Sequence, residues 1–195
     1  MKLIPLYSLL TIAFFASCQH PEPAQPPEPE PEEVSLITWD TCSQNIGDHV
    51  CDFTLVNQFD EDFTLYDHVE KIIVLDFTAA WCGPCQRAAA EVQETQDKYE
   101  SDGLLYLTVL IENLDREPPT QEDVEDWADY FGIVTAPVLG GSRDMLGLPD
   151  EGWPLTGWPT FYFVDDKMVL QDSQRGWSSE LLDNLIRDHL GLKDE

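Results

Sequence analysis

The chain has 195 residues, 43% of them hydrophobic, and its 38 acidic against 10 basic residues give a formal net charge of −28 at pH 7. Charge of this sign repels the phosphates of nucleic acids and of anionic lipids, so we expect neither as a surface partner. The length beyond the first 34 residues suits one domain that buries roughly 70% of the surface of its unfolded chain.

The N-terminus is typical of an export signal. Lys2 is followed by an apolar stretch over residues 3–16, which is shorter than the about 20 residues that a membrane-spanning helix needs. Residues 15–18, Phe-Ala-Ser-Cys, resemble the lipobox of bacterial lipoproteins, in which the cysteine is lipidated. We therefore expect residues 1–17 to be a lipoprotein signal peptide and Cys18 to carry the lipid. Ordinary cleavage nearby, without a lipid, is the alternative.

A segment rich in proline and glutamate follows, over residues 18–34. Such a composition buries little and favours extended polyproline II conformations with self-repelling charge. At ~3.1 Å per residue it would hold a folded domain of residues 35–195 roughly 40 Å from an anchoring membrane. These features predict an exported protein that is tethered to a membrane in the bacterial periplasm or cell envelope.

The folded domain begins with a pair of cysteines, Cys42 and Cys51. In an exported protein we expect a structural disulfide between them; two free thiols or a second redox pair are the alternatives. Residues 51–66 contain two short alternating runs around a polar turn, which predicts a β-hairpin.

The most informative stretch starts with an apolar, β-branched run over residues 72–77, which predicts a strand buried on both faces of a sheet. Two cysteines, Cys82 and Cys85, follow, and then a helix-forming segment over residues 86–99. Three residues of that segment recur at helical spacing and are expected to face the core: Ala89, Val92 and Tyr99.

A dithiol at the start of a helix suits thiol–disulfide exchange, because the attacking group is a thiolate. The N–H groups and the positive end of the dipole at a helix N-terminus favour that anion. We expect Cys82 to lie exposed as the nucleophile, and Cys85, partly buried in the first turn, to resolve the mixed disulfide. Pro84 suits a first helical turn, and Gly83 keeps the surface low for a protein substrate.

Asp76 lies in the otherwise apolar strand, six positions before Cys82. A carboxylate there costs free energy unless it is protonated, solvated or partnered. The functional interpretation is a proton acceptor and donor for Cys85 with a pKa raised by desolvation. The alternative is an aspartate at the edge of the strand that reaches water.

Residues 104–111 predict a second buried strand, which completes a parallel β-α-β unit. An insertion over residues 112–156 comes next, and its expected role is to shape the substrate surface or to support the fold. Its expected elements are a helix that starts with a capping box of Thr120 and Asp123 and ends at Gly132, a strand over residues 136–139 and a helical turn over residues 142–146.

The C-terminal part begins with Trp158-Pro159 and a strand over residues 160–164. A turn over residues 165–167 and a return strand over residues 168–171 follow, before a helix capped by Ser178. Five apolar residues of this helix are expected to face inward: Leu181, Leu182, Leu185, Ile186 and Leu190.

Two motifs in this order resemble a known family. Trp-Cys-Gly-Pro-Cys at residues 81–85, with Asp76 upstream, resembles the active site of thioredoxins, and residues 157–164 resemble the segment that carries a cis-proline opposite the dithiol. The longer layout is similar to the membrane-anchored TlpA/ResA-like branch, over roughly residues 45–190. The resemblance implies an α/β thioredoxin fold: a central mixed sheet flanked by helices, with an N-terminal β-hairpin and an inserted helix and strand.

The resemblance also implies a substrate groove beside Cys82. In the family pattern Pro159 is cis, which frees the backbone of the preceding residue to pair with an incoming peptide; a trans edge proline is the alternative. Trp158 departs from the small or β-branched residue that is common at its position. The expected substrate-binding residues are Trp81, Gly83, Pro84, Trp158 and Pro159.

The leading hypothesis is a thiol–disulfide oxidoreductase. Gly-Pro between the cysteines resembles the reducing members of the family, which predicts that the protein reduces disulfides of exported proteins and takes its electrons from an unidentified thiol donor. We expect a monomer that needs no cofactor and no metal.

The alternatives are a thiol peroxidase of the peroxiredoxin type, a module that binds zinc or copper, and a thioredoxin fold used only for binding. Peroxiredoxins carry a proline seven residues and a threonine three residues before their reactive cysteine, where this chain has Leu75 and Ala79. A zinc site would need four ligands to converge, and the candidates outside the dithiol are Cys42, His49, Cys51 and His68. A thioredoxin fold used only for binding would not need both thiols.

Overall fold

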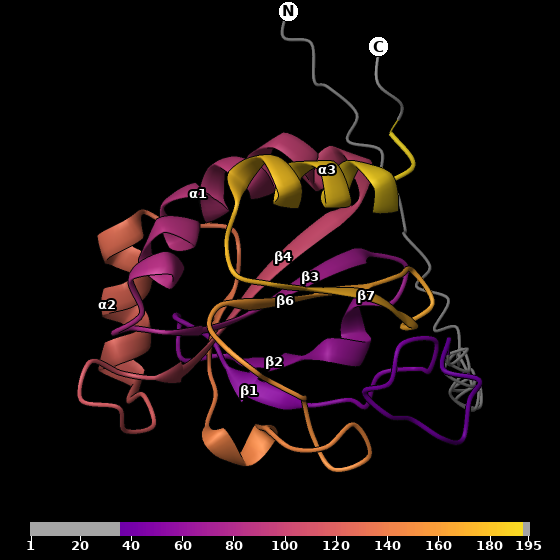
Figure 1. Cartoon of the computed structure of the whole chain (residues 1–195), viewed down its shortest axis with the longest axis horizontal. Coiled ribbons are helices and arrows are strands. Elements are labelled where there is room, and N and C mark those ends of the chain that lie inside the picture. The colour runs from indigo at the N-terminus through magenta and orange to yellow at the C-terminus, as the bar shows by residue number, and fades with distance from the viewer. Residues whose placement is uncertain (1–35, 193–195) are drawn as a thin grey trace, which may run out of the picture. The chain divides into compact units, whose positions relative to one another are not determined.

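The computed structural model describes residues 36–192 (Figure 1). The predicted signal peptide over residues 1–17, the whole of the predicted tether over residues 18–34 and the lipidation site Cys18 therefore lie outside the described residues, and residue 35 does too. The elements, in chain order, are β1 (Thr54–Val56), β2 (Asp62–Thr64), β3 (Ile72–Ala79), α1 (Gly83–Tyr99), β4 (Leu104–Glu112), α2 (Gln121–Phe131), β5 (Val138–Gly140), β6 (Thr160–Val164), β7 (Leu170–Arg175) and α3 (Ser179–His189).

Five strands form one mixed sheet in the order β5-β4-β3-β6-β7. β3 is parallel to β4 and β4 to β5, whereas β6 is antiparallel to both β3 and β7. β1 and β2 form a separate antiparallel hairpin. The predicted hairpin, the parallel β-α-β unit and the inserted helix and strand are all present, so the sheet places the end of β3 and the start of β6 side by side.

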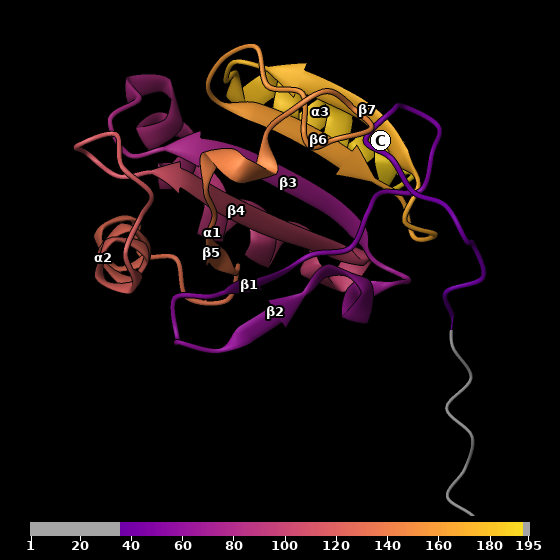
Figure 2. The ribbon, with the colours of Figure 1, turned by 90° about the horizontal axis from the view of Figure 1, so that it is seen from below.

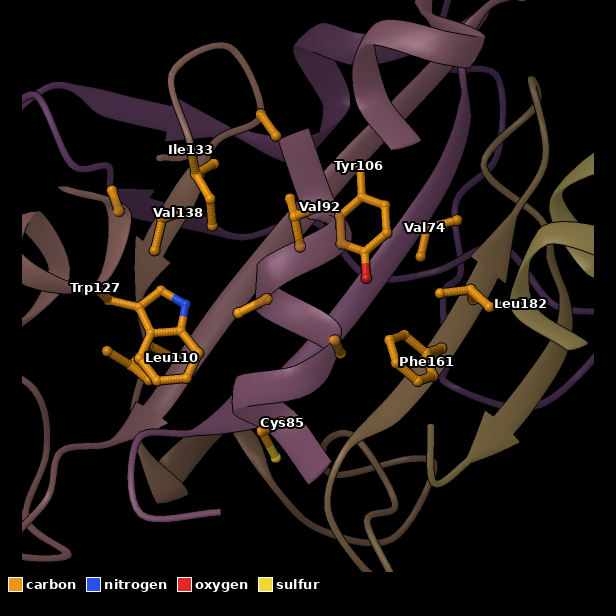
Figure 3. Packing of buried hydrophobic residues seen from close by; sticks show 14 of the residues in the cluster. Val74, Cys85, Val92, Tyr106, Leu110, Trp127, Ile133, Val138, Phe161 and Leu182 are labelled. Carbon is orange, nitrogen blue, oxygen red and sulfur yellow. The ribbon is translucent and has the colours of Figure 1, made fainter. Parts of the chain in front are cut away.

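The two faces of the sheet carry different covers. α1 and α3 lie over one face, with α2 beside the β5 edge, and the hairpin lies against the other face (Figures 1 and 2). Alternate residues of β3 follow this division, because Val74 packs into the core on the helix side and Leu75 and Phe77 into the core on the hairpin side. Figure 3 shows the helix-side core, in which Val92 of α1 packs beside Tyr106 of β4.

The ends of the helices are set by capping residues. The Cys82 sulfur caps α1 by accepting a hydrogen bond from the backbone N–H of Cys85. Thr120 and Asp123 form the predicted capping box at the start of α2, which ends at Gly132 with φ of +67°. The Ser178 side chain caps α3. A side-chain cap therefore marks the start of each of the helices α1, α2 and α3.

α1 starts at Gly83, so Pro84 and Cys85 lie in its first turn as predicted. Two expectations near the ends of elements are wrong. The return strand β7 covers Leu170–Arg175 and not residues 168–171, because Met168 has a positive φ and stays in the turn. Leu181 is 41% exposed, whereas Leu182 and Ile186 are buried.

The segment before the hairpin is held to the domain by a disulfide between Cys42 and Cys51, whose Cα atoms lie 4.9 Å apart. Close by, the ring of Trp39 stacks on that of His49, and its indole N–H donates to the Tyr66 hydroxyl at 3.0 Å. These contacts place the first described residues against the hairpin side of the domain. Within residues 36–192, none of the helices has both the length and the apolar character that a bilayer crossing requires.

We expect the double variant Cys42→Ser/Cys51→Ser to have a free energy of unfolding lower by about 2.7 kcal/mol, because the ten-residue loop that the disulfide closes restricts the unfolded chain. Urea unfolding followed by tryptophan fluorescence measures the difference, with Cys82 and Cys85 kept oxidised in both proteins. Equal unfolding midpoints and slopes for the two proteins would show that this disulfide does not stabilise the fold.

Candidate active site

The dithiol lies where β3 passes into α1. Cys82 and Cys85 are joined by a disulfide, with their Cα atoms 5.2 Å apart. Cys85 is completely buried, and Cys82 is only 5% exposed. The expectation of an exposed Cys82 is therefore wrong for the oxidised protein, because its sulfur is bonded to a buried partner and both cysteines join the helix-side core, against which Trp81 and Trp158 pack.

The surroundings of Cys82 favour a negative charge on its sulfur. The N–H of Cys85 points at that sulfur, with a nitrogen–sulfur distance of 3.3 Å, and the N-terminus of a 17-residue helix adds its dipole. Gly83 and Pro84 are exposed next to it. A Cβ atom added to Gly83 would meet only the side chain of Arg87, at 3.9 Å, so the surface here is low and open.

Asp76 is a buried carboxyl with little hydrogen-bonding support. It is 1% exposed, and burial raises its pKa to about 8, against the opposing effect of a hydrogen bond from the Tyr106 hydroxyl. That bond is long, at 3.4 Å, and the other carboxyl oxygen has no partner among the described residues. Asp76 therefore does not lie at a strand edge, and its proton is available near neutral pH.

A small polar cluster surrounds this carboxyl on the helix side of the sheet. Thr108 of β4 is the register partner of Asp76, and its hydroxyl is buried without a partner among the described residues, like that of Thr78 two positions after Asp76. Figure 3 shows Tyr106 beside α1, with Cys85 at the start of that helix. Tyr106 and Thr108 could not be predicted as neighbours of Asp76, because only the β3–β4 register reveals which residues of β4 lie beside it.

The segment before β6 lies against the dithiol. The Trp158–Pro159 peptide bond is cis, and the rings of Trp158 and Trp81 meet edge to face with centroids 6.5 Å apart. Thr160 pairs with Phe77 near the end of β3. The structure therefore brings together the predicted dithiol, the buried Asp76 and the predicted groove residues, which come from both ends of the domain sequence.

A second buried carboxylate holds Trp81 in place. Glu112, the last residue of β4, accepts a hydrogen bond from the indole N–H of Trp81 at 2.7 Å and one from Arg143. Burial raises its pKa, but these bonds outweigh burial, so the pKa of Glu112 lies below its ordinary value. The Arg116 guanidinium lies 4.1 Å from the centre of the Trp81 ring. The sequence gives no signal for this cluster, because Glu112 is adjacent to the dithiol only after β4 pairs with β3.

The other predicted residues lie apart from this site. Cys42 and Cys51 are oxidised, whereas a zinc site would use cysteine as thiolate. In residues 36–192, the histidine, cysteine, aspartate and glutamate side chains form no group of three that would hold a metal ion. Leu75 and Ala79, which replace the proline and threonine of peroxiredoxins, are both completely buried in the core.

Comparison with known proteins gives consistent matches. The model of the AhpC/TSA family matches residues 46–173. The thioredoxin-like protein YneN of Bacillus subtilis is 28% identical over 130 residues, which are 67% of this chain and 71% of that protein. The thiol-disulfide oxidoreductase ResA of Geobacillus kaustophilus is 28% identical over 120 residues, 62% of this chain but only 63% of ResA.

A solved structure supports the same fold. The crystal structure of a thiol:disulfide interchange protein of the thioredoxin family from Chlorobium tepidum superposes with a TM-score of 0.60 at 21% identity. The match covers 78% of this chain and the whole of that one. The fold predicted from the dithiol and proline motifs is therefore confirmed.

We expect Asp76→Asn to stabilise the protein more as the pH rises. The pKa of Asp76 is about 8 in the folded state and ~3.9 in an unfolded chain. Between these pH values the folded state keeps a proton that the unfolded state has lost, so the free energy of unfolding of the wild type falls as the pH rises. The variant lacks this carboxyl group, so this contribution to the pH dependence is absent. Urea unfolding should give the variant an advantage of several kcal/mol at pH 9 and a much smaller one at pH 5.

The exposed Asp166 provides the matched control. Asp166→Asn removes one exposed carboxylate and serves as the reference against which the Asp76→Asn difference at each pH is compared. A pH-independent difference between Asp76→Asn and the wild type would contradict a raised pKa at Asp76.

Proposed function

Since the chain belongs to the AhpC/TSA family and is similar to the thioredoxin-like proteins YneN and ResA, we propose that it is a thiol–disulfide oxidoreductase. It would reduce protein disulfides through Cys82 and Cys85. One observation carries the proposal: a dithiol capping α1 lies at the end of a strand that buries Asp76, and beside it lies the segment with the cis Pro159. Together these supply a nucleophile, a resolving thiol, a proton acceptor and a peptide-binding edge.

The proposed reaction is two successive thiol–disulfide exchanges. In the reduced protein the Cys82 thiolate attacks one sulfur of the substrate disulfide, which forms a mixed disulfide and releases the first substrate thiolate. The Cys85 thiolate then attacks the Cys82 sulfur, which forms the Cys82–Cys85 bond seen in the structure and releases the second substrate thiolate. Two electrons pass to the substrate, and an external thiol donor returns the protein to the dithiol form.

Asp76 is proposed to move the proton of Cys85. Cys85 is completely buried, so its proton has no direct path to bulk water. A carboxyl with a pKa of about 8 exists in both protonation states near neutral pH, as a group that both accepts and donates a proton must. The low surface at Gly83 and Pro84 and the paired rings of Trp81 and Trp158 would then hold the substrate backbone beside Pro159.

The protein is proposed to act outside the cytoplasm. The apolar N-terminal stretch and Cys18 support export and lipid anchoring, and residues 18–34 would serve as the tether of a monomeric domain. The Cys42–Cys51 disulfide supports an oxidising compartment. Its substrates would be disulfide-containing exported proteins.

We expect Cys82→Ser to lower the reduction of insulin by dithiothreitol to the uncatalysed background, because no other described thiol is placed to attack. Cys85→Ser should instead accumulate a mixed disulfide with the substrate, visible on a non-reducing gel and released by excess reductant. The variant Cys42→Ser/Cys51→Ser is the control and should keep its turnover at temperatures where it is folded. Wild-type turnover by Cys82→Ser would refute the proposed role of this cysteine.

A further inference from the structure

Arginines gather around the dithiol in a protein that is otherwise strongly acidic. The part of the chain that the structure describes, residues 36–192, contains five arginines. Four of them surround the active site, and we call them the arginine rim: Arg87, Arg116, Arg143 and Arg175. All four are exposed.

Each rim residue contacts a part of the site. Arg87 donates a hydrogen bond to the carbonyl of Gly83, between the two cysteines, at 3.4 Å. Arg116 lies over the ring of Trp81, and Arg143 binds the carboxylate that holds that ring. Arg175 pairs with Thr160, next to Pro159, and its side chain would lie 3.1 Å from a Cβ atom added to Gly157. The rim therefore spans both the dithiol side and the proline side of the groove.

The lysines lie elsewhere. Lys71 precedes the first residue of β3, at the end of the strand away from the dithiol, and Lys167 lies in the nearby turn between β6 and β7. The two regions are joined by a hydrogen bond from the N–H of Glu70 to the carbonyl of Asp166. Lys98 pairs with Asp183 of α3. The positive charge at the site is thus all arginine, whose planar guanidinium binds carboxylates in a bidentate manner.

Some carboxylates oppose the rim. Glu112 neutralises Arg143, and Asp115 and Glu117 flank Arg116 in the loop after β4. The other three rim residues form no ion pair within residues 36–192. Arg116 is partly compensated by Glu112, whose pKa it helps to lower, and Arg87 and Arg175 are cations at the groove with no ion-pair partner in the described chain.

We propose that the rim selects disulfides that are flanked by acidic residues, so that carboxylates on both sides of the attacked cysteine pair with Arg87, Arg116 and Arg175. This rests on the proposed function and adds the substrate class. A net charge of −28 repels acidic partners at long range, so the rim acts locally, once the substrate lies on the groove. Each exposed ion pair contributes a factor of about two to five in affinity, and two or three pairs together about tenfold.

The test uses two synthetic peptides with the same intramolecular disulfide, in which the residues next to each cysteine are either glutamate or glutamine. The purified full chain reduces each peptide with dithiothreitol as donor, and the preference is the ratio of kcat/KM for the glutamate peptide to that for the glutamine peptide. The rim variant is Arg116→Gln/Arg175→Gln. The control is Lys71→Gln/Lys167→Gln, which changes the net charge by the same amount at the far end of the sheet.

We expect the preference for the glutamate peptide over the glutamine peptide to fall at least fivefold in the rim variant and less than twofold in the control. An equal loss in both variants would mean that only the overall charge matters, and no loss in the rim variant would mean that the rim does not select; either result overturns the proposal and leaves the oxidoreductase function intact. If the wild type reduces both peptides no faster than Cys82→Ser does, the proposed function itself fails.

Discussion

The active site depends on one junction, at which the Cys82 sulfur accepts the N–H of Cys85 and so becomes the cap of α1. The sulfur that would carry the negative charge in the proposed exchange is also the atom that accepts a hydrogen bond from an otherwise unpaired N–H of the helix. β3 is buried on both faces, and its end therefore holds Cys82 in position at the start of α1. In the proposed reaction, a thiolate formed at Cys82 would therefore lie beside a backbone N–H that already points at this sulfur.

Two carboxyl groups near this junction, those of Asp76 and Glu112, have pKa values that are shifted in opposite directions. Asp76 faces the helix-side core with one long hydrogen bond, and burial raises its pKa to about 8. Glu112 is also inaccessible to solvent but lies nearer the protein surface, and the guanidinium of Arg143 and the N–H of Trp81 hold its pKa low. The first is suited to exchange a proton near neutral pH. The second remains an anion that positions Trp81 beside the nucleophile.

Local patterns account for most of the fold and for the chemistry of the site. The apolar run of β3, the capping box of α2 and the cysteine spacing each depend on residues close together in the chain, so they can be recognised without the fold. Tyr106, Thr108 and Glu112 could not be assigned, because their roles arise from the register of β4 against β3. The burial of Cys82 was missed for a similar reason, since Trp158, which packs against the core cluster that contains Cys82, comes from a segment 76 residues away. The signal peptide, the tether and the anchor stay predictions.

The connection between β5 and β6 is integral to the active site and is not an appendage. Arg143 of this connection binds Glu112, which in turn holds Trp81. Trp153 packs against Phe77 and Tyr162 in the hairpin-side core, and Trp158 contacts Trp81 at the groove. A movement of this connection would shift an ion pair, a core aromatic and the groove wall together. The insertion that makes the chain longer than a minimal thioredoxin therefore supports both the position of Trp81 beside the dithiol and the hairpin-side core.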